Sequence, residues 1–282
     1  MAETVAEPAP YIFHRDHKSS IRLNYQHMLV KKLCDDRLLH PAVQQSIASR
    51  SSIRVADVAT GTALWLTELS DALPADSQLL GFDISADQYP PGEWLPENVS
   101  LREQDAFEPF APELRGSFDV VHLRFFITLL NGENIRPLLD NLKTLLKPGG
   151  FLQWLDFDPR SARAIATRTG MHMPRTESVV SIMRKAQPDV GSWILHDSEL
   201  LKAAGLNPIA YERLRLRNYL RPVWNHCHLM GMEELSRRMS RGEDKPSPLV
   251  QQIKDLEAEF AQGASVDAEW FIMVGQMPDT QE

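Results

Sequence analysis

A turn of small residues separates a strand-like run from a helix-like run near residue 60. Ile53, Val55 and Val58 form a short apolar run of β-branched side chains, which is typical of a buried parallel strand. The turn that follows is Ala-Thr-Gly-Thr-Ala over residues 59–63, and only side chains this small let a ligand touch the backbone. Asp83 ends the next strand-like run, where a carboxylate can accept hydrogen bonds from a ribose. These residue types in this order predict a nucleotide-binding site.

Two kinds of cofactor suit that geometry, and the turn distinguishes between them. A dinucleotide requires the pattern G-x-G-x-x-G, because backbone amides and a helix N-terminus must hold its pyrophosphate. Here the pattern is A-x-G-x-A, and Leu64 occupies the third glycine position. S-adenosylmethionine has no phosphate, so its site needs only close backbone approach and an acid for the ribose. The turn therefore favours S-adenosylmethionine.

Three histidines are candidates for a group that accepts a proton. His122 and Arg124 lie two apart in a predicted strand over 118–126, so both are expected on one face near its carboxyl end. The neighbouring cation disfavours protonation of His122, which keeps the imidazole usable as a base. His226 and His228 have helical surroundings but do not share a face, so they make a poor metal pair, although either could line an acceptor pocket. Purely structural roles for all three are left open.

Hydrophobic periodicity locates the elements that must position these residues. Further strands are predicted over 79–84, 99–102, 149–158, 212–217 and 269–277. Helices are predicted to begin near residues 19, 41, 64, 135, 176, 197, 224 and 249. The strand over 212–217 alternates arginine with leucine, which favours a position at a sheet edge, where charge discourages further pairing.

Five motifs in order resemble those of class I S-adenosylmethionine-dependent methyltransferases: VADVATGTALW, GFDIS, QDAF, FDVVHLRFF and LLKPGGFLQW. RLNYQH and QYPPGEWLPENV resemble more narrowly the fungal methyltransferase-like proteins of secondary metabolism. The resemblance covers residues 15–160 well and the remainder loosely. It departs from the class at Ala59 and Ala63, where most members carry glycine, and each alanine is expected to place a methyl group beside the methionine part of the cofactor.

The resemblance implies an α/β, Rossmann-like methyltransferase fold. Its sheet is expected to be mostly parallel and seven-stranded, with an antiparallel last strand and a helical lid. A single domain over 14–282 would follow a disordered leader over 1–13. Helical cover is expected over 14–50, 158–195 and 218–262, with a substrate lid near 160–173.

The resemblance also implies which residues bind the methyl donor: Asp57, Ala59, Gly61, Asp83, Ile84, Gln104, Asp105, Ala106, His122 and Arg124. Asp105 matches the class position that accepts a hydrogen bond from the adenine amino group, and Phe107 is expected beside the adenine ring. No metal ligand set is expected. The candidate bases are His122, His226 and His228.

Composition excludes several other classes of protein. The net charge of −8 would repel nucleic acid and anionic membranes, so neither is an expected partner. Cys34 and Cys227 form neither a disulfide framework nor a zinc site, and two reduced thiols favour a cytoplasmic protein. No apolar run is long enough to span a bilayer. The expected partner is a small-molecule acceptor, and a homodimer is left open.

The expected function is methyl transfer from S-adenosylmethionine to a small natural product of secondary metabolism, with oxygen as the expected acceptor atom. Such a reaction requires alignment of the two reactants, exclusion of water and removal of one proton. Two alternatives stay open at this stage. One is a dehydratase or pericyclase on the same fold. The departures from the class pattern at Ala59 and Ala63 leave this alternative open. The other is a methyltransferase-like regulator that acts through partners.

Overall fold

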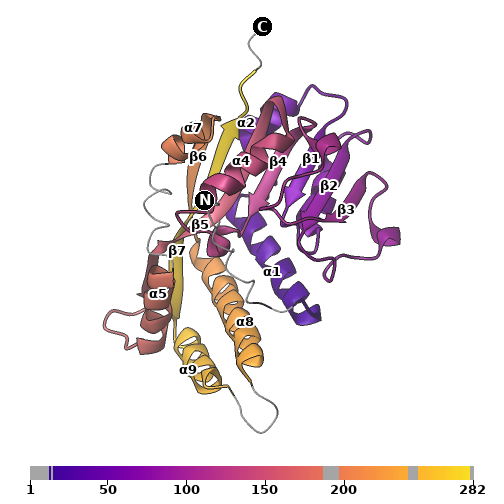
Figure 1. Cartoon of the computed structure of the whole chain (residues 1–282). Helices are drawn as coiled ribbons and strands as arrows, with labels where there is room; N and C mark the ends of the chain where they lie inside the picture. Colours follow the sequence, from indigo (N-terminus) through magenta and orange to yellow (C-terminus); the bar gives the residue numbers. More distant parts are fainter. Residues whose placement is uncertain (1–12, 14, 187–196, 241–246, 280–282) are drawn as a thin grey trace, which may run out of the picture.

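The computed structural model describes residues 13, 15–186, 197–240 and 247–279. Its strands are β1 (Arg54–Val58), β2 (Gln78–Asp83), β3 (Val99–Glu103), β4 (Phe118–Arg124), β5 (Leu146–Ala166), β6 (Asn207–Arg215) and β7 (Ala264–Gln276). They form one seven-stranded sheet in the order β3-β2-β1-β4-β5-β7-β6 (Figure 1). β7 is antiparallel to both of its neighbours, and the other pairs are parallel. This arrangement confirms the predicted fold class.

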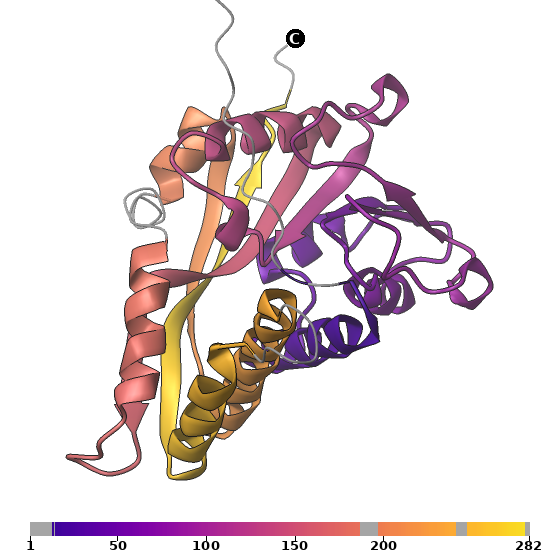
Figure 2. The ribbon, with the colours of Figure 1, turned by 60° about the horizontal axis from the view of Figure 1, so that its bottom comes forward.

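Helices pack around the sheet, and three of them gather at one end of it. The described helices are α1 (His17–Leu33), α2 (Pro41–Ile47), α3 (Leu64–Ala72), α4 (Ile135–Leu145), α5 (Pro174–Ala186), α7 (Asp197–Ala203), α8 (Arg221–Met239) and α9 (Leu249–Ala261). Short 3-10 turns are η1 (Gly92–Trp94), η2 (Pro112–Leu114), η3 (Ile127–Leu129) and η4 (Asn218–Leu220). Figure 2 shows α1, α8 and α9 together at one end of the molecule. The leader predicted over 1–13 lies outside the described residues apart from Phe13, and the single domain over 14–282 stays a prediction.

The central strands are buried as their apolar sequences predict. Every residue of β1 after Arg54 is buried, and so is every residue of β4 before Arg124. A strand covered on both faces favours apolar side chains, which Ile53, Val55, Ala56 and Val58 supply. β1, β2 and β4 lie side by side and parallel, so their carboxyl ends meet at one edge of the sheet.

β5 and β7 are longer than the sequence suggests. Residues 160–166, expected to belong to a substrate lid, instead continue β5, and β7 begins at Ala264 rather than near residue 269. After an irregularity between Asp158 and Arg163, residues 163–166 pair with 264–267. We call these paired residues the β5–β7 extension. The start of the helical cover predicted over 158–195 is therefore wrong, because helix begins only at Pro174.

The expected edge strand is confirmed, with different bounds. β6 covers Asn207–Arg215 rather than 212–217, and it pairs only with β7 within the described residues. Its arginines alternate with apolar residues as the sequence indicates, and Leu214 is buried. The helical cover predicted over 14–50 contains α1 and α2, and that over 218–262 contains α8 and α9.

A buried ion pair joins α1 to α8. Arg22 Nε lies 2.8 Å from Glu234 Oε1, and Arg22 Nη2 donates to Glu234 Oε2 over 3.3 Å. The two side chains are only 5% and 2% exposed. At the start of α1, Asp16 accepts from Ser19 N over 3.0 Å as a helix cap and also from Arg237 Nη1 over 2.6 Å. These contacts fix the position of α8 relative to α1.

Candidate functional site

A cavity of about 300 Å³ lies at the carboxyl ends of β1, β2 and β4. Most of the residues predicted to bind the cofactor line it: Ala59, Gly61, Asp83, Ile84, Gln104, Asp105, Ala106 and Arg124. They come from the turn after β1, the end of β2, the loop after β3 and the end of β4. Leu23 of α1 covers the cavity from the other side. We call it the donor cavity.

The turn after β1 adopts a backbone conformation that glycine favours. Ala59, Gly61 and Ala63 have φ values of 58°, 57° and 60°. At Gly61 a side chain would also meet Leu23 of α1, since an added Cβ would lie 3.3 Å from Leu23 Cδ1. The two alanines bear the strain of the left-handed conformation, about 1 kcal/mol each. Ala59 lines the cavity, whereas Ala63 is fully buried at the start of α3 and does not line it.

Asp83 is held in the donor cavity by the same turn. Gly61 N donates to Asp83 Oδ2 over 2.9 Å, which ties the end of β2 to the turn after β1. Burial raises the pKa of the Asp83 carboxyl, and the backbone N–H groups of Gly61 and Ser85 oppose that rise. The carboxylate lines the cavity, and its two oxygens keep acceptor capacity beyond the bonds from these backbone N–H groups. It can therefore accept from ligand hydroxyl groups.

The loop after β3 supplies a second carboxylate and an aromatic wall. Asp105 Oδ1 accepts from Phe107 N over 2.9 Å, which shapes the loop as an Asx turn. Phe107 lies 5.6 Å from Phe126 between ring centroids, and both rings line the cavity. A flat ligand ring can pack on such a wall, and Asp105 lines the same cavity.

Asp57 and His122 lie behind the cavity rather than in it. They face each other across β1 and β4, with His122 Nδ1 2.7 Å from Asp57 Oδ1, and Thr60 Oγ1 donates to Asp57 Oδ2 over 2.7 Å. The His122 ring stacks on Trp65 with a centroid distance of 3.6 Å. Neither residue lines the cavity, and both are almost fully buried. Contact of both residues with the cofactor, and the use of His122 as a base, stay predictions that the cavity lining does not support.

His226 and His228 are also outside the donor cavity. His226 is exposed on α8, and its Nδ1 lies 3.2 Å from the Tyr25 hydroxyl. The His228 ring packs against Trp224 at 4.6 Å, and burial lowers its pKa to about 4. Within the described residues His228 Nε2 has no hydrogen-bond partner. The structure therefore does not bring together the three histidines predicted as bases.

Residues 25–241 match a family model described as a methyltransferase domain. The chain belongs to this methyltransferase family. Together with the relatives described below, this match identifies the chain as an S-adenosylmethionine-dependent methyltransferase. It confirms the family resemblance and the cofactor that were inferred from the motifs. Helices of the described part of the chain all lack the length and apolar character that spanning a membrane requires.

Fungal proteins are among the relatives of this methyltransferase. The N-methyltransferase tcpN of Claviceps purpurea is 29% identical over 254 residues, which cover 86% of this chain and 87% of tcpN. The methyltransferase grgD of a Penicillium species is 30% identical over 168 residues, 57% of each chain. Among solved structures, a putative sarcosine dimethylglycine methyltransferase from Galdieria sulphuraria matches 92% of this chain and 86% of its own, with a TM-score of 0.49 and 13% identity.

Arg124 gives the methyltransferase a positive charge at the donor cavity. Its Nη1 donates to His27 Nδ1 over 2.9 Å. A neutral His27 ring therefore carries its proton on Nε2, and this atom lies 3.1 Å from Glu68 Oε2. Burial lowers the pKa of His27 to about 4 and keeps the ring neutral. No carboxylate of the described residues forms an ion pair with Arg124. The guanidinium is thus oriented from α1 and α3 and is available to an anionic ligand group.

An aromatic turn after β4 was missed from the sequence. Phe125, Phe126 and Leu129 line the cavity of the methyltransferase, and Phe125 has a φ of 53°. Asp156 of β5 holds this turn, because its Oδ2 accepts from Phe126 N over 2.7 Å and from Ile127 N over 2.9 Å. An acidic residue within the apolar run of β5 was the available signal, since a buried carboxylate must find donors.

Replacing His122 with glutamine is expected to lower the free energy of unfolding by about 1–2 kcal/mol, because the hydrogen bond to Asp57 and the stack on Trp65 are weakened. Turnover should change by less than about threefold, and the pH dependence of the rate should keep its shape. Urea unfolding and pH–rate profiles of the two proteins test this. A hundredfold slower variant with an altered profile would restore His122 as a base.

Proposed function

We propose that the chain transfers a methyl group from S-adenosylmethionine to a nitrogen atom of a small molecule. The observation that carries the proposal is the chemistry of the donor cavity. Among the described residues that line it there is no histidine, lysine, cysteine or tyrosine, and its two carboxylates are those suited to the donor. A neutral amine suits such a cavity because it attacks through its own lone pair and needs no base beforehand. The name N-methyltransferase of the relative tcpN points the same way. The oxygen acceptor expected from the sequence stays a prediction.

The residues of the donor cavity fit S-adenosylmethionine. Asp83 would accept from the ribose hydroxyls, and Asp105 with Phe107 would hold the adenine. The turn containing Gly61 would allow close backbone approach to the methionine part, and Arg124 would pair with its carboxylate. When bound, this donor supplies a methyl group on a positively charged sulfur that leaves as a neutral thioether.

The protein contributes alignment and exclusion of water. Phe125, Phe126 and Leu129 form an apolar wall of the cavity, which keeps water from competing with the acceptor. The acceptor nitrogen forms the bond to the methyl carbon as the carbon–sulfur bond breaks, and the electron pair of that bond goes to sulfur. The proton that the nitrogen still carries leaves afterwards to solvent. Positioning therefore supplies most of the rate enhancement.

The test uses S-adenosylmethionine with a deuterated methyl group and a panel of amines matched with phenols of the same skeleton. The expected product carries the label on nitrogen, and the rate rises with pH through the acceptor's own pKa. Label on oxygen would support the acceptor atom expected from the sequence. An unlabelled product isomeric with its substrate would overturn methyl transfer to that compound.

Replacing Asp83 with alanine is expected to weaken binding of S-adenosylhomocysteine by about ten- to a hundredfold, because charge-assisted hydrogen bonds to the ribose are lost. Asp105→Ala should cost less, since water can replace a carboxylate at the adenine amino group. Titration calorimetry on the folded variants measures both. Equal affinities of parent and Asp83→Ala would refute the place of Asp83 in the site.

A cytoplasmic location and a homodimer stay predictions. Sedimentation of the purified protein is the direct measurement of its oligomeric state.

A further inference from the structure

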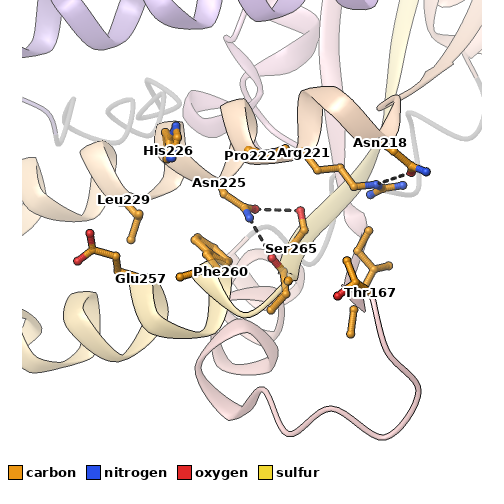
Figure 3. A pocket seen from close by; sticks show the side chains of 15 residues that line it. Thr167, Asn218, Arg221, Pro222, Asn225, His226, Leu229, Glu257, Phe260 and Ser265 are labelled. Atoms are coloured by element: carbon orange, nitrogen blue, oxygen red, sulfur yellow. Dashed lines mark hydrogen bonds between the residues drawn. The ribbon is translucent and has the colours of Figure 1, made fainter.

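A second and larger cavity lies on the outer side of α8. It has a volume of about 610 Å³ and is enclosed by α8, α9 and the β5–β7 extension (Figure 3). None of its lining residues lines the donor cavity. Arg221, Asn225 and Leu229 face it from α8, at the spacing of one helix face. We call it the outer cavity.

The opposite face of α8 packs toward the donor cavity. Trp224 is buried, and its ring lies 4.9 Å from that of Trp270. The Trp270 ring in turn lies 5.7 Å from Phe125, which lines the donor cavity. Two tryptophan rings therefore stand between the cavities. The outer cavity is therefore distinct from the donor cavity.

The middle of the outer cavity is lined by apolar side chains and by polar groups that bond to one another. Leu229 and Phe260 point into it between α8 and α9. Its buried polar groups satisfy one another: Ser265 Oγ donates to Asn225 Oδ1 over 2.9 Å, and Asn225 Nδ2 donates to the Ala264 carbonyl over 3.0 Å. Because these groups are already paired, the middle favours the apolar body of a ligand.

One end of the outer cavity has surplus positive charge. Arg221 Nη1 lies 3.1 Å from Asp267 Oδ1, while Arg163 pairs with the other oxygen of the same carboxylate. Asp267 is 2% exposed, so two guanidinium groups share one buried negative charge. Arg221 lines the cavity, and its Nη1 is buried without a well-formed hydrogen bond among the described residues. This end attracts an anion.

The other end carries the opposite charge. Glu257 lines the cavity far from Arg221, as Figure 3 shows, with His226 on the same side. A carboxylate there repels an anionic group and leaves Arg221 as its partner. The two ends therefore orient a ligand that has a single anionic group.

We propose that the outer cavity binds a small molecule with an apolar body and one anionic group, and that the anion lies at Arg221. The site is separate from the donor cavity and does not depend on the proposed acceptor atom.

Two matched fluorescent probes test the proposal: anilinonaphthalene sulfonate, and N-phenylnaphthylamine, which has the same ring skeleton without the anion. Each is titrated with and without saturating S-adenosylhomocysteine, which would occupy the donor cavity. Leu229→Trp, which fills the outer cavity, is expected to weaken the binding of both probes by about tenfold or more. Val250→Trp is the matched control, because Val250 is 39% exposed on α9 and does not line the cavity. It should bind both probes like the parent.

Arg221→Met tests the anionic end. Asp267 keeps its pair with Arg163 in this variant, so the fold should tolerate it. Binding of the sulfonate should weaken by about tenfold, and that of the neutral probe should not change. If Leu229→Trp lacks a cooperative melting transition, Ala261→Phe fills the same space from α9. Unchanged probe binding in the folded filled variant would overturn the site, and equal losses for both probes in Arg221→Met would overturn its anionic end. Failure of S-adenosylhomocysteine to bind would count against the proposed function alone.

Discussion

Replacing Asp156 with alanine is expected to lower the free energy of unfolding by about 4 kcal/mol or more. Asp156 Oδ2 accepts from Phe126 N, Ile127 N and Trp154 Nε1 over 2.7, 2.9 and 3.1 Å, and the residue is fully buried. Each donor left unsatisfied in the interior costs about 1–3 kcal/mol. The variant also releases the turn after β4, so binding of S-adenosylhomocysteine should weaken with it. Urea unfolding measures the first effect and calorimetry the second.

Asp156→Asn is the matched control. It keeps one carbonyl oxygen for the same donors, so the expected loss is smaller, about 1–2 kcal/mol. If alanine and asparagine cost the same, the donors do not depend on Asp156.

The parent and Asp156→Asn should also differ in how their free energy of unfolding depends on pH. Burial raises the pKa of Asp156 from 3.8 to about 7, against the opposing effect of its N–H donors. Between those values the folded protein holds a proton that the unfolded chain has lost. The corresponding stabilisation is therefore complete below about pH 4 and is lost as the pH rises through 7. The parent should lose stability relative to Asp156→Asn from pH 5 to 8. Parallel stability curves would contradict the raised pKa.

Replacing Glu234 with leucine is expected to destabilise the protein by about 3 kcal/mol or more, because Arg22 keeps a buried charge without its carboxylate. Since α1 also supplies Leu23 to the donor cavity, binding of S-adenosylhomocysteine should weaken as well. Equilibrium unfolding in urea measures the first effect.

The double variant Arg22→Met with Glu234→Leu separates charge from packing. It removes both charges and keeps apolar volume, so most of the lost stability should return. A double variant as unstable as Glu234→Leu alone would show that packing, rather than the unpaired charge, determines the loss.

The parts of the site that the sequence predicted are those in which neighbouring residues form one local structure. Gly61 and Asp83 were located because a small-residue turn and a strand end each leave a short, complete pattern. Asp105 and Phe107 were found in the same way, as one loop after one strand. The sheet was predictable because buried strands require continuous apolar runs.

The features that the sequence did not indicate depend on contacts between distant residues. Asp57 lies opposite His122 in the neighbouring strand, where the two side chains contact each other, His122 stacks on Trp65, and neither residue lines the donor cavity. Nothing local to either residue indicates that partner. The β5–β7 extension was missed for a similar reason. Residues 160–166 include several alanines, which have low strand propensity, and they form a strand because β7 supplies the other half of the ladder.

The place of β7 in the sheet affects how the chain folds during synthesis. β7 lies between β5 and β6, although it is the last described strand to leave the ribosome. β5 and β6 therefore emerge without the partner that each requires, and β5 keeps an open edge until residues near 276 are made. Such long-range pairing slows folding, and open edges invite association with other chains. The strands around the donor cavity, β1 to β4, pair with one another and do not require β7. The nascent protein can form the half that holds the donor well before the half that carries α8 and α9, and its exposure to chaperones and proteases is concentrated in that interval.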